Sequence, residues 1–144
     1  MSLEEQIEPI TTKVVHTIQP ESSVHDAATL MAKEGVGSLM VASLNGAAGI
    51  ITDRDILMKV TAKGIDPKVA RVKGVMSTLV TTSKLSTVGE VARLMAGSSA
   101  WRVGVTGDDG QLVGIITATD LVNWMATKEK LSDSLINYLE HETF

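Results

Sequence analysis

The chain contains one sequence pattern twice, and this internal repeat restricts the possible folds more than any other feature. Residues 24–32 read VHDAATLMA and residues 88–96 read VGEVARLMA, so equivalent positions lie 64 residues apart. A second block, GIITDRDIL at 49–57, returns as GIITATDLV at 114–122, where the separation is 65 residues. Two blocks that recur in the same order predict one supersecondary unit built twice.

Each copy predicts the element order β-α-β-β-α. The first helix of each copy follows a suitable N-cap, Ser22 or Ser23 in one and Ser86 or Thr87 in the other, and Gly35 is a suitable C-cap. The remaining expected elements are strands at 14–18, 39–42 and 48–51 with a helix from 53 to about 63, then strands at 79–82, 103–106 and 112–116 with a helix from 119 to about 127. One copy alone would leave an apolar sheet face exposed, so we expect an α+β pair of tandem repeats with pseudo-twofold symmetry.

The one-residue difference in spacing falls at a predicted hairpin turn. Asn45-Gly46 in the first copy corresponds to Asp108-Asp109-Gly110 in the second, and an insertion at a surface turn is tolerated. The expected organisation is repeat 1 at 8–63, a linker at 64–74, repeat 2 at 75–127 and a tail at 128–144. The tail predicts an amphipathic helix from Lys128 to about Glu140, which packs on its own domain or forms a dimer contact.

Composition excludes several classes of function. Hydrophobic residues make up 44% of the chain and aromatic residues only 3%, so aliphatic side chains and methionine must build the core. The net charge is −4 with no basic run, which argues against a nucleic-acid surface. The chain has no cysteine and no apolar stretch of the length needed to span a bilayer. We therefore expect a soluble cytoplasmic protein that contacts neither nucleic acid nor membrane.

Each copy ends in the motif Gly-hydrophobic-hydrophobic-Thr-x-x-Asp, which suits a ligand site. Thr52 and Thr117 stand where a strand enters a helix, so their hydroxyls and the free N-terminal amides suit a phosphate. Asp55 and Asp120 follow one helical turn later and face the same side. A carboxylate accepts hydrogen bonds from both ribose hydroxyls but repels phosphate. The alternative role is a capping box, in which the Asp only supports the helix N-terminus, and both roles can coexist.

The doubled β-α-β-β-α pattern with its two Thr-x-x-Asp motifs resembles a cystathionine-β-synthase (CBS) domain pair, or Bateman module. Val75-Met76-Ser77 before the second copy is similar to the Val-Met-Thr opening of that family. The resemblance covers roughly residues 8–127, and the chain resembles the stand-alone CBS proteins. It implies a regulatory, energy-sensing module that binds AMP, ADP or ATP and has no catalytic cofactor. It also implies a homodimer and, separately, an unknown protein partner. S-adenosylmethionine and NAD are the alternative ligands.

The resemblance also implies which residues meet at each site, in a cleft between the repeats. There, the first-strand approach of one repeat would join the Thr-x-x-Asp motif of the other. Its backbone groups would read the adenine edge, and aliphatic side chains would sandwich the ring. Carried over by position, Thr117 and Asp120 would meet Ile10, Thr11, Lys13, Val15, Val36 and Gly37, and Thr52 and Asp55 would meet Val75, Ser77, Thr78, Val80, Ala100 and Trp101.

The two sites are expected to differ. Arg102 precedes the expected second strand of repeat 2, where the family often places a phosphate-contacting base, and the equivalent residue in repeat 1 is the neutral Ser38. Arg54 lies inside the first motif, opposite Thr119 in the second, and either serves the Asp55 site or is a solvated surface residue. We predict that the site around Thr117, Asp120 and Arg102 is the better phosphate binder.

Other functions have less support from the sequence. A purely structural reading is a dimeric scaffold in which both Thr-x-x-Asp motifs serve as helix caps. Catalysis is disfavoured because nothing assembles a nucleophile with a base, and no Gly-rich phosphate loop is present. His16, His25 and His141 show no ligand spacing, so no metal site is expected. Trp101 either stacks on a base or packs between the repeats.

Overall fold

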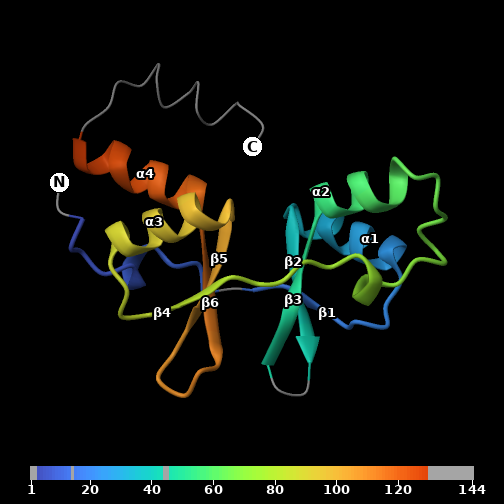
Figure 1. Cartoon of the computed structure of the whole chain (residues 1–144), viewed down its shortest axis with the longest axis horizontal. Coiled ribbons are helices and arrows are strands. Elements are labelled where there is room, and N and C mark those ends of the chain that lie inside the picture. Colours follow the sequence, from blue (N-terminus) through green and yellow to red (C-terminus); the bar gives the residue numbers. More distant parts are fainter. Residues whose placement is uncertain (1–2, 14, 44–45, 130–144) are drawn as a thin grey trace. The chain divides into compact units, whose positions relative to one another are not determined.

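The computed structural model describes residues 3–13, 15–43 and 46–129, which fall into two compact units (Figure 1). The first-repeat unit comprises residues 14–79, and the second-repeat unit comprises residues 1–13 together with 80–144. Each unit has its own three-stranded sheet and its own hydrophobic core. The chain is therefore an α+β protein with a doubled β-α-β-β-α order, as the repeat predicts. The predicted boundaries of repeats and linker stay a prediction.

The first-repeat unit has the sheet order β1-β2-β3, with β1 parallel and β3 antiparallel to the central strand. Its elements are β1 (Thr17–Ile18), α1 (Val24–Glu34), β2 (Ser38–Ser43), β3 (Gly46–Thr52), α2 (Asp53–Ile56), a π-helical turn η2 (Leu57–Thr61) and a 3-10 turn η3 (Val72–Gly74). The helices pack on one face of the sheet (Figure 1). Fully buried Leu39, Val41 and Ile51 on the strands meet Val24 of α1 and Val60 of η2.

The second-repeat unit repeats this arrangement with the sheet order β4-β5-β6. Its elements are a 3-10 turn η1 (Glu8–Ile10), β4 (Thr81–Ser83), α3 (Val88–Ser98), β5 (Arg102–Thr106), β6 (Leu112–Thr117) and α4 (Ala118–Glu129). Its core joins Val91 of α3, Val103 and Ile116 of the sheet, and Trp124 of α4. Trp124 is only 9% exposed, so this indole is a core residue.

Local sequence signals explain where the helices begin and end. Ser23 and Thr87 are the N-caps of α1 and α3, and each hydroxyl accepts a hydrogen bond from the backbone N–H three residues on. Gly35 ends α1 in the left-handed conformation with φ of 66°, which glycine adopts without steric cost. Ser99 takes the same conformation after α3. The predicted hairpin at 108–110 turns through Gly110, whereas Asn45 lies outside the described residues, as does most of the predicted C-terminal helix.

The second helix of repeat 1 differs from the sequence prediction. The pattern predicts one regular helix from 53 to about 63, but the α-helix covers only Asp53–Ile56 and continues as a π-helical turn. The amide of Ala62 donates to the carbonyl of Leu57 five residues earlier, at 2.8 Å, which is the π spacing. The strands β1 and β4 are also shorter than predicted, because only their ends pair with the central strands.

The segment that leads into each repeat is bonded to the sheet of the other repeat. Thr12 exchanges two backbone hydrogen bonds with Ile115 of β6, and Ser77 does the same with Ile50 of β3. Ile7, fully buried, belongs to the core of the second-repeat unit. The glycines that open the two motifs permit this approach, because a Cβ on Gly49 would lie 2.6 Å from the carbonyl oxygen of Ser77.

Candidate functional site

The Thr-x-x-Asp motif of repeat 1 forms a capping box at the N-terminus of α2. The backbone N–H of Asp55 donates to Thr52 Oγ1 at 3.0 Å, and the backbone N–H of Thr52 donates to Asp55 Oδ2 at 3.0 Å. The geometry therefore holds the carboxylate at the point where β3 ends and α2 begins. Asp53 is similarly local, since its Oδ1 accepts from the backbone N–H of Arg54 at 2.8 Å.

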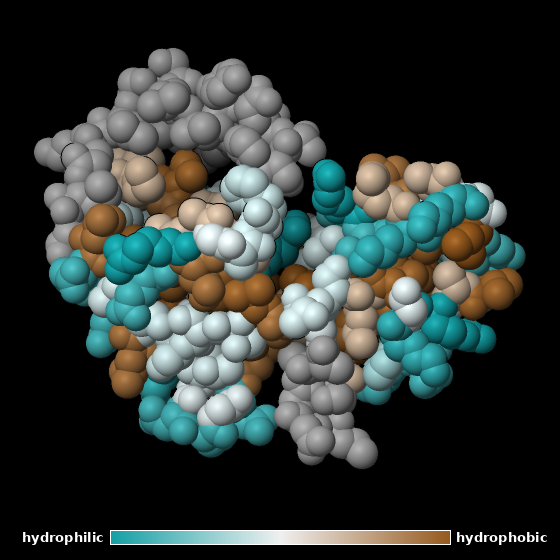
Figure 2. All heavy atoms as spheres, in the orientation of Figure 1, coloured by the Kyte–Doolittle hydropathy of each residue, from teal (hydrophilic) through white to brown (hydrophobic). Residues whose placement is uncertain are grey.

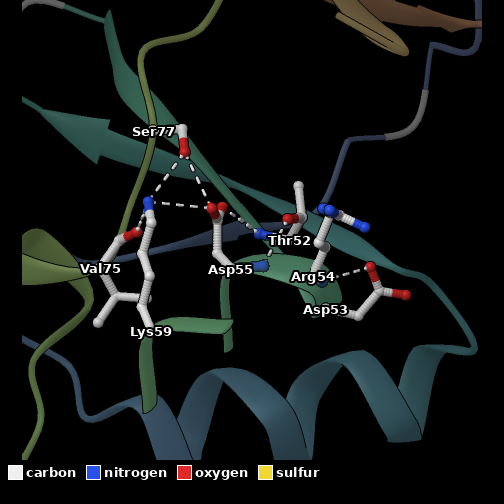
Figure 3. Close-up of polar contacts among 7 residues, drawn as sticks. All are labelled: Thr52, Asp53, Arg54, Asp55, Lys59, Val75 and Ser77. Carbon is white, nitrogen blue, oxygen red and sulfur yellow. Dashed lines mark hydrogen bonds and ion pairs between the residues drawn. The ribbon is translucent and has the colours of Figure 1, made fainter. Parts of the chain in front are cut away.

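The other carboxylate oxygen of Asp55, Oδ1, contacts two side chains. Lys59 lies one helical turn further along, and Ser77 lies on the segment that leads into repeat 2. Ser77 Oγ donates to Asp55 Oδ1 at 2.9 Å, and Lys59 Nζ lies 3.1 Å from the same oxygen. Lys59 Nζ also donates to the carbonyl oxygen of Val75 at 2.9 Å and to Ser77 Oγ at 3.3 Å. Figure 3 shows the three side chains of Asp55, Lys59 and Ser77 pointing toward one another, with Arg54 apart from them.

This environment keeps Asp55 ionised. Burial raises the pKa of the Asp55 carboxyl, because a charged group loses solvation. The hydrogen bonds from Lys59, Ser77 and Thr52 together outweigh burial, so the pKa lies below the ordinary aspartate value of 3.8. The Asp55 side chain is only 12% exposed, and the Lys59 side chain, whose ammonium balances its charge, is 43% exposed.

Sequence reasoning missed Lys59, and the π-helical turn explains why. The position equivalent to Lys59 in the second repeat is Trp124, which is buried in the core of its unit. In repeat 1 the buried position is instead the next residue, Val60, which is 1% exposed. The extra residue of the π turn shifts the buried face by one position, so Lys59 is directed to the carboxylate and not into the core. Only the break in the apolar pattern, a Lys opposite a Trp, signals this change in sequence.

The motif of repeat 2 has the same backbone geometry and fewer partners. The backbone N–H of Thr117 donates to Asp120 Oδ2 at 2.8 Å, and that of Asp120 donates to Thr117 Oγ1 at 3.1 Å. Thr12 takes the place of Ser77, but it makes no hydrogen bond to the carboxylate. Within the described part of the chain, Asp120 Oδ1 has no hydrogen-bond or ion-pair partner.

Arg102 lies beside this second motif. It is the first residue of β5 and pairs directly with Thr117 of β6, so the two side chains project from the same face of the sheet. Ser38 stands opposite Thr52 in the equivalent place of the first-repeat unit. Arg102 is partly exposed and makes no ion pair with any residue that the structure describes. A cation without a counterion, next to a helix N-terminus, suits an anionic ligand group.

The other predicted site residues divide between the two units. Ile10, Thr11 and Lys13 share the unit of Asp120, and Val75, Ser77 and Thr78 share the unit of Asp55. The remaining candidates fall in the unit that does not contain the motif they were assigned to, and their role stays a prediction: Val15, Val36, Gly37, Val80, Ala100 and Trp101. Trp101 is 62% exposed, and its backbone carbonyl accepts a hydrogen bond from the first amide of α4 at 2.9 Å. Arg54 is exposed, and Lys13 lies 4.0 Å from Glu8.

The family model for the CBS domain matches the chain twice, at residues 6–62 and 72–127. The chain belongs to the CBS domain family. CBS domain pairs are regulatory modules known to bind adenosine ligands, and stand-alone CBS proteins are generally regulatory rather than catalytic. Both matched segments are CBS domains. Among the described residues no cluster of metal-ligating side chains is present, and none of their helices has the length and apolar character to cross a membrane.

Similar proteins include stand-alone CBS proteins and CBS domains joined to other segments. The CBS domain-containing protein YhcV of Bacillus subtilis is 33% identical over 129 residues, which cover 89% of this chain and 90% of that protein. A hexameric CBS-CP12 protein from bloom-forming cyanobacteria has a TM-score of 0.80 at 30% identity, covering 96% of this chain and 78% of that one. CBSX2, solved in complex with AMP, has a TM-score of 0.72, covering 87% and 98%, but its 24% identity shows the fold alone.

Proposed function

We propose that this CBS domain pair binds an adenine nucleotide of the AMP, ADP or ATP class and thereby regulates a partner protein. The observation that carries the proposal is the surroundings of Asp120. One of its carboxylate oxygens holds the start of α4, and the other has no partner among the described residues. A helix cap alone needs only the first oxygen, so the second is available to a ligand.

The groups near Asp120 match the two polar parts of a nucleotide. A carboxylate oxygen accepts from a ribose hydroxyl, and a neutral ligand without such a donor would leave it unmatched. The N-terminus of α4 carries partial positive charge, and Arg102 adds a full positive charge on the same strand-to-helix corner. Phosphate is therefore expected toward Arg102 and the sugar toward Asp120. Thr11 and Lys13 lie on the segment that leads into repeat 1, which belongs to the same unit as Asp120, and they are further candidates for contact with the nucleotide.

The test must separate ligand binding from helix capping, because Asp120 does both in this proposal. Asp120→Asn keeps an oxygen that accepts from the Thr117 amide but removes the charge that favours the ribose hydroxyls. Glu90→Gln is the matched control, since Glu90 holds the same place in the capping box of α3. Calorimetric titration with AMP, ADP, ATP, adenosine, S-adenosylmethionine and NAD should show nucleotide binding by the wild type and by Glu90→Gln, weakened about tenfold or more in Asp120→Asn.

Two results would contradict the proposal. One is the absence of heat with every adenosine ligand. The other is an equal loss of stability in both variants with unchanged nucleotide affinity, which would support the scaffold role. Tighter binding of S-adenosylmethionine or NAD than of AMP, ADP and ATP would move the assignment to those ligands. Regulation itself requires the nucleotide to bind two conformations of the module with different affinity.

We also propose that the module forms a homodimer. The surfaces of both units carry apolar side chains (Figure 2), and the π-helical turn of the first-repeat unit exposes Leu57 to 56% and Met58 to 51%. Adjacent exposed side chains of this size favour burial against a second copy. Sedimentation of the wild type should give a dimer mass, and Met58→Glu a monomer mass. A monomeric wild type would contradict this proposal without affecting nucleotide binding.

A further inference from the structure

We infer that Lys59 competes with nucleotide for Asp55, so that the first-repeat motif is closed by the chain's own ammonium group and the Asp120 motif is the higher-affinity site. The inference rests on the proposed function and adds a regulatory contact to it. It follows from three features of the first-repeat unit: the two partners on Asp55 Oδ1, the additional contact of Lys59 to Val75, and the shape of the helix that carries Lys59.

Asp55 Oδ1, the oxygen equivalent to the unpartnered Oδ1 of Asp120, has no acceptor position left that a ribose hydroxyl would reach without displacing a protein group. Oδ2 accepts from the Thr52 amide at 3.0 Å, and Oδ1 receives both Ser77 Oγ at 2.9 Å and Lys59 Nζ at 3.1 Å. A ribose diol would have to replace the Ser77 hydroxyl, the ammonium, or both. Replacement of the ammonium would separate an ion pair between the Asp55 side chain, which is 12% exposed, and the Lys59 side chain, which is 43% exposed.

The ammonium also occupies a backbone acceptor on the approach segment. Lys59 Nζ donates to the carbonyl oxygen of Val75 at 2.9 Å, and it reaches Ser77 Oγ at 3.3 Å. The side chain thus ties the end of β3, the start of α2 and the approach segment into one cluster (Figure 3). A ligand that used either the carboxylate or this carbonyl would meet the same competitor.

The helix geometry shows that this placement is built into repeat 1. A regular α-helix would put Lys59 in the buried position that Trp124 fills in repeat 2. The π-helical turn gives that position to Val60 and leaves Lys59 partly exposed beside the carboxylate. π turns are uncommon and occur mostly at functional sites. The described α4 helix of repeat 2 has neither the π turn nor the lysine, and Asp120 Oδ1 has no hydrogen-bond or ion-pair partner among the described residues.

The test measures AMP affinity at the first motif in a background where binding at the second motif is weakened. In an Asp120→Asn background, Lys59→Met removes the ammonium and keeps an unbranched side chain of similar length, and Lys63→Met is the matched control because Lys63 is an exposed lysine of the same segment. Calorimetric titration with AMP should show about fivefold tighter binding with Lys59→Met and no change with Lys63→Met. Unchanged or weaker binding with Lys59→Met would overturn the inference, and weaker binding would identify Lys59 as a ligand contact.

A second measurement does not depend on a variant that must fold. Acetylation of wild-type lysines by acetic anhydride, read by mass spectrometry, should be slower at Lys59 than at Lys63 without nucleotide and should rise at Lys59 when AMP saturates the protein. Equal reactivity of Lys59 and Lys63 without AMP overturns the competitor role. Absence of AMP binding in every variant overturns the proposed function and this inference together, whereas AMP binding without gain in Lys59→Met overturns the inference alone.

Discussion

Asp55→Asn should lower the stability of the protein more than Asp120→Asn does, although the two residues hold equivalent places in the two motifs. Both substitutions keep an oxygen for the amide of the capping threonine, and both remove a negative charge from a helix N-terminus, which is worth about 0.3–1 kcal/mol. Asp55 loses more, because its charge also pairs with Lys59 and accepts from Ser77.

The magnitude follows from those two additional contacts. A partly exposed ion pair contributes about 0.2–1 kcal/mol, and a hydrogen bond to a charged acceptor exceeds one to a neutral acceptor by a similar amount. We expect Asp55→Asn to cost about 2 kcal/mol and Asp120→Asn about 1 kcal/mol or less. Urea unfolding at pH 7, followed by circular dichroism, measures both values. A double-mutant cycle with Lys59→Met should show a coupling of about 1 kcal/mol between Asp55 and Lys59.

The stability difference between the wild type and Asp55→Asn must also decrease as the pH falls. The pKa of Asp55 is below 3.8 in the folded protein, so the native state stabilises the ionised form. Its contribution is fully present above the unfolded-state pKa and is lost as the pH falls through the lower, folded-state value. The gap between wild type and Asp55→Asn should therefore shrink when the unfolding is repeated in strong acid. Equal losses in the two Asn variants, or a gap that stays constant with pH, would refute this reasoning.

Three further predictions concern the packing and the charge asymmetry. Gly114→Ala should destabilise the second-repeat unit by about 2 kcal/mol in urea unfolding, because the new Cβ would lie 2.5 Å from a facing backbone carbonyl, whereas Gly97→Ala, which meets nothing within 4 Å, should stabilise α3 slightly. Ile7→Ala should lower stability by about 2–5 kcal/mol, seen as a lower melting temperature, because it opens a cavity in a fully buried place. Arg102→Ser should weaken AMP binding about tenfold without changing adenosine binding in calorimetry, and Ser38→Ala should change neither.

Local signals in the sequence predict most of the fold. The caps Ser23 and Thr87, the C-cap Gly35 and the apolar spacing of both first helices act over one or two turns, so they can be read from neighbouring residues. The two sheets have the same strand order because each copy has a strand, a helix and a hairpin in the same order along the chain. The Thr-x-x-Asp motif predicts a ligand site, a capping box or both, and the structure has the capping box at Thr52 and Asp55.

Contacts between distant segments were accessible only through the family resemblance. Nothing in the spacing places Ser77 on β3 or Thr12 on β6, because each pairing joins one repeat to the segment that precedes the other. The burial of Ile7 is equally unpredictable from local spacing. It depends on a distant segment just before α3, where the Ile7 amide donates to the Ser86 carbonyl at 3.1 Å. Gly49 is the one local sequence signal of this arrangement that we identify, because the absence of a side chain leaves room for the backbone of Ser77.

The role of Lys59 was not predictable from the motif, because a motif fixes which residues are present and not which neighbours they receive. Thr52-x-x-Asp55 and Thr117-x-x-Asp120 share their backbone hydrogen bonds to within a few tenths of an ångström. Their carboxylates nevertheless differ in charge balance, because a helix irregularity one turn along directs Lys59 to one of them. The sequence-based expectation of unequal sites rested on Arg102, an added cation at the second motif. The inferred role of Lys59, an internal cation at the first motif, adds a second and independent argument for the same order of affinities.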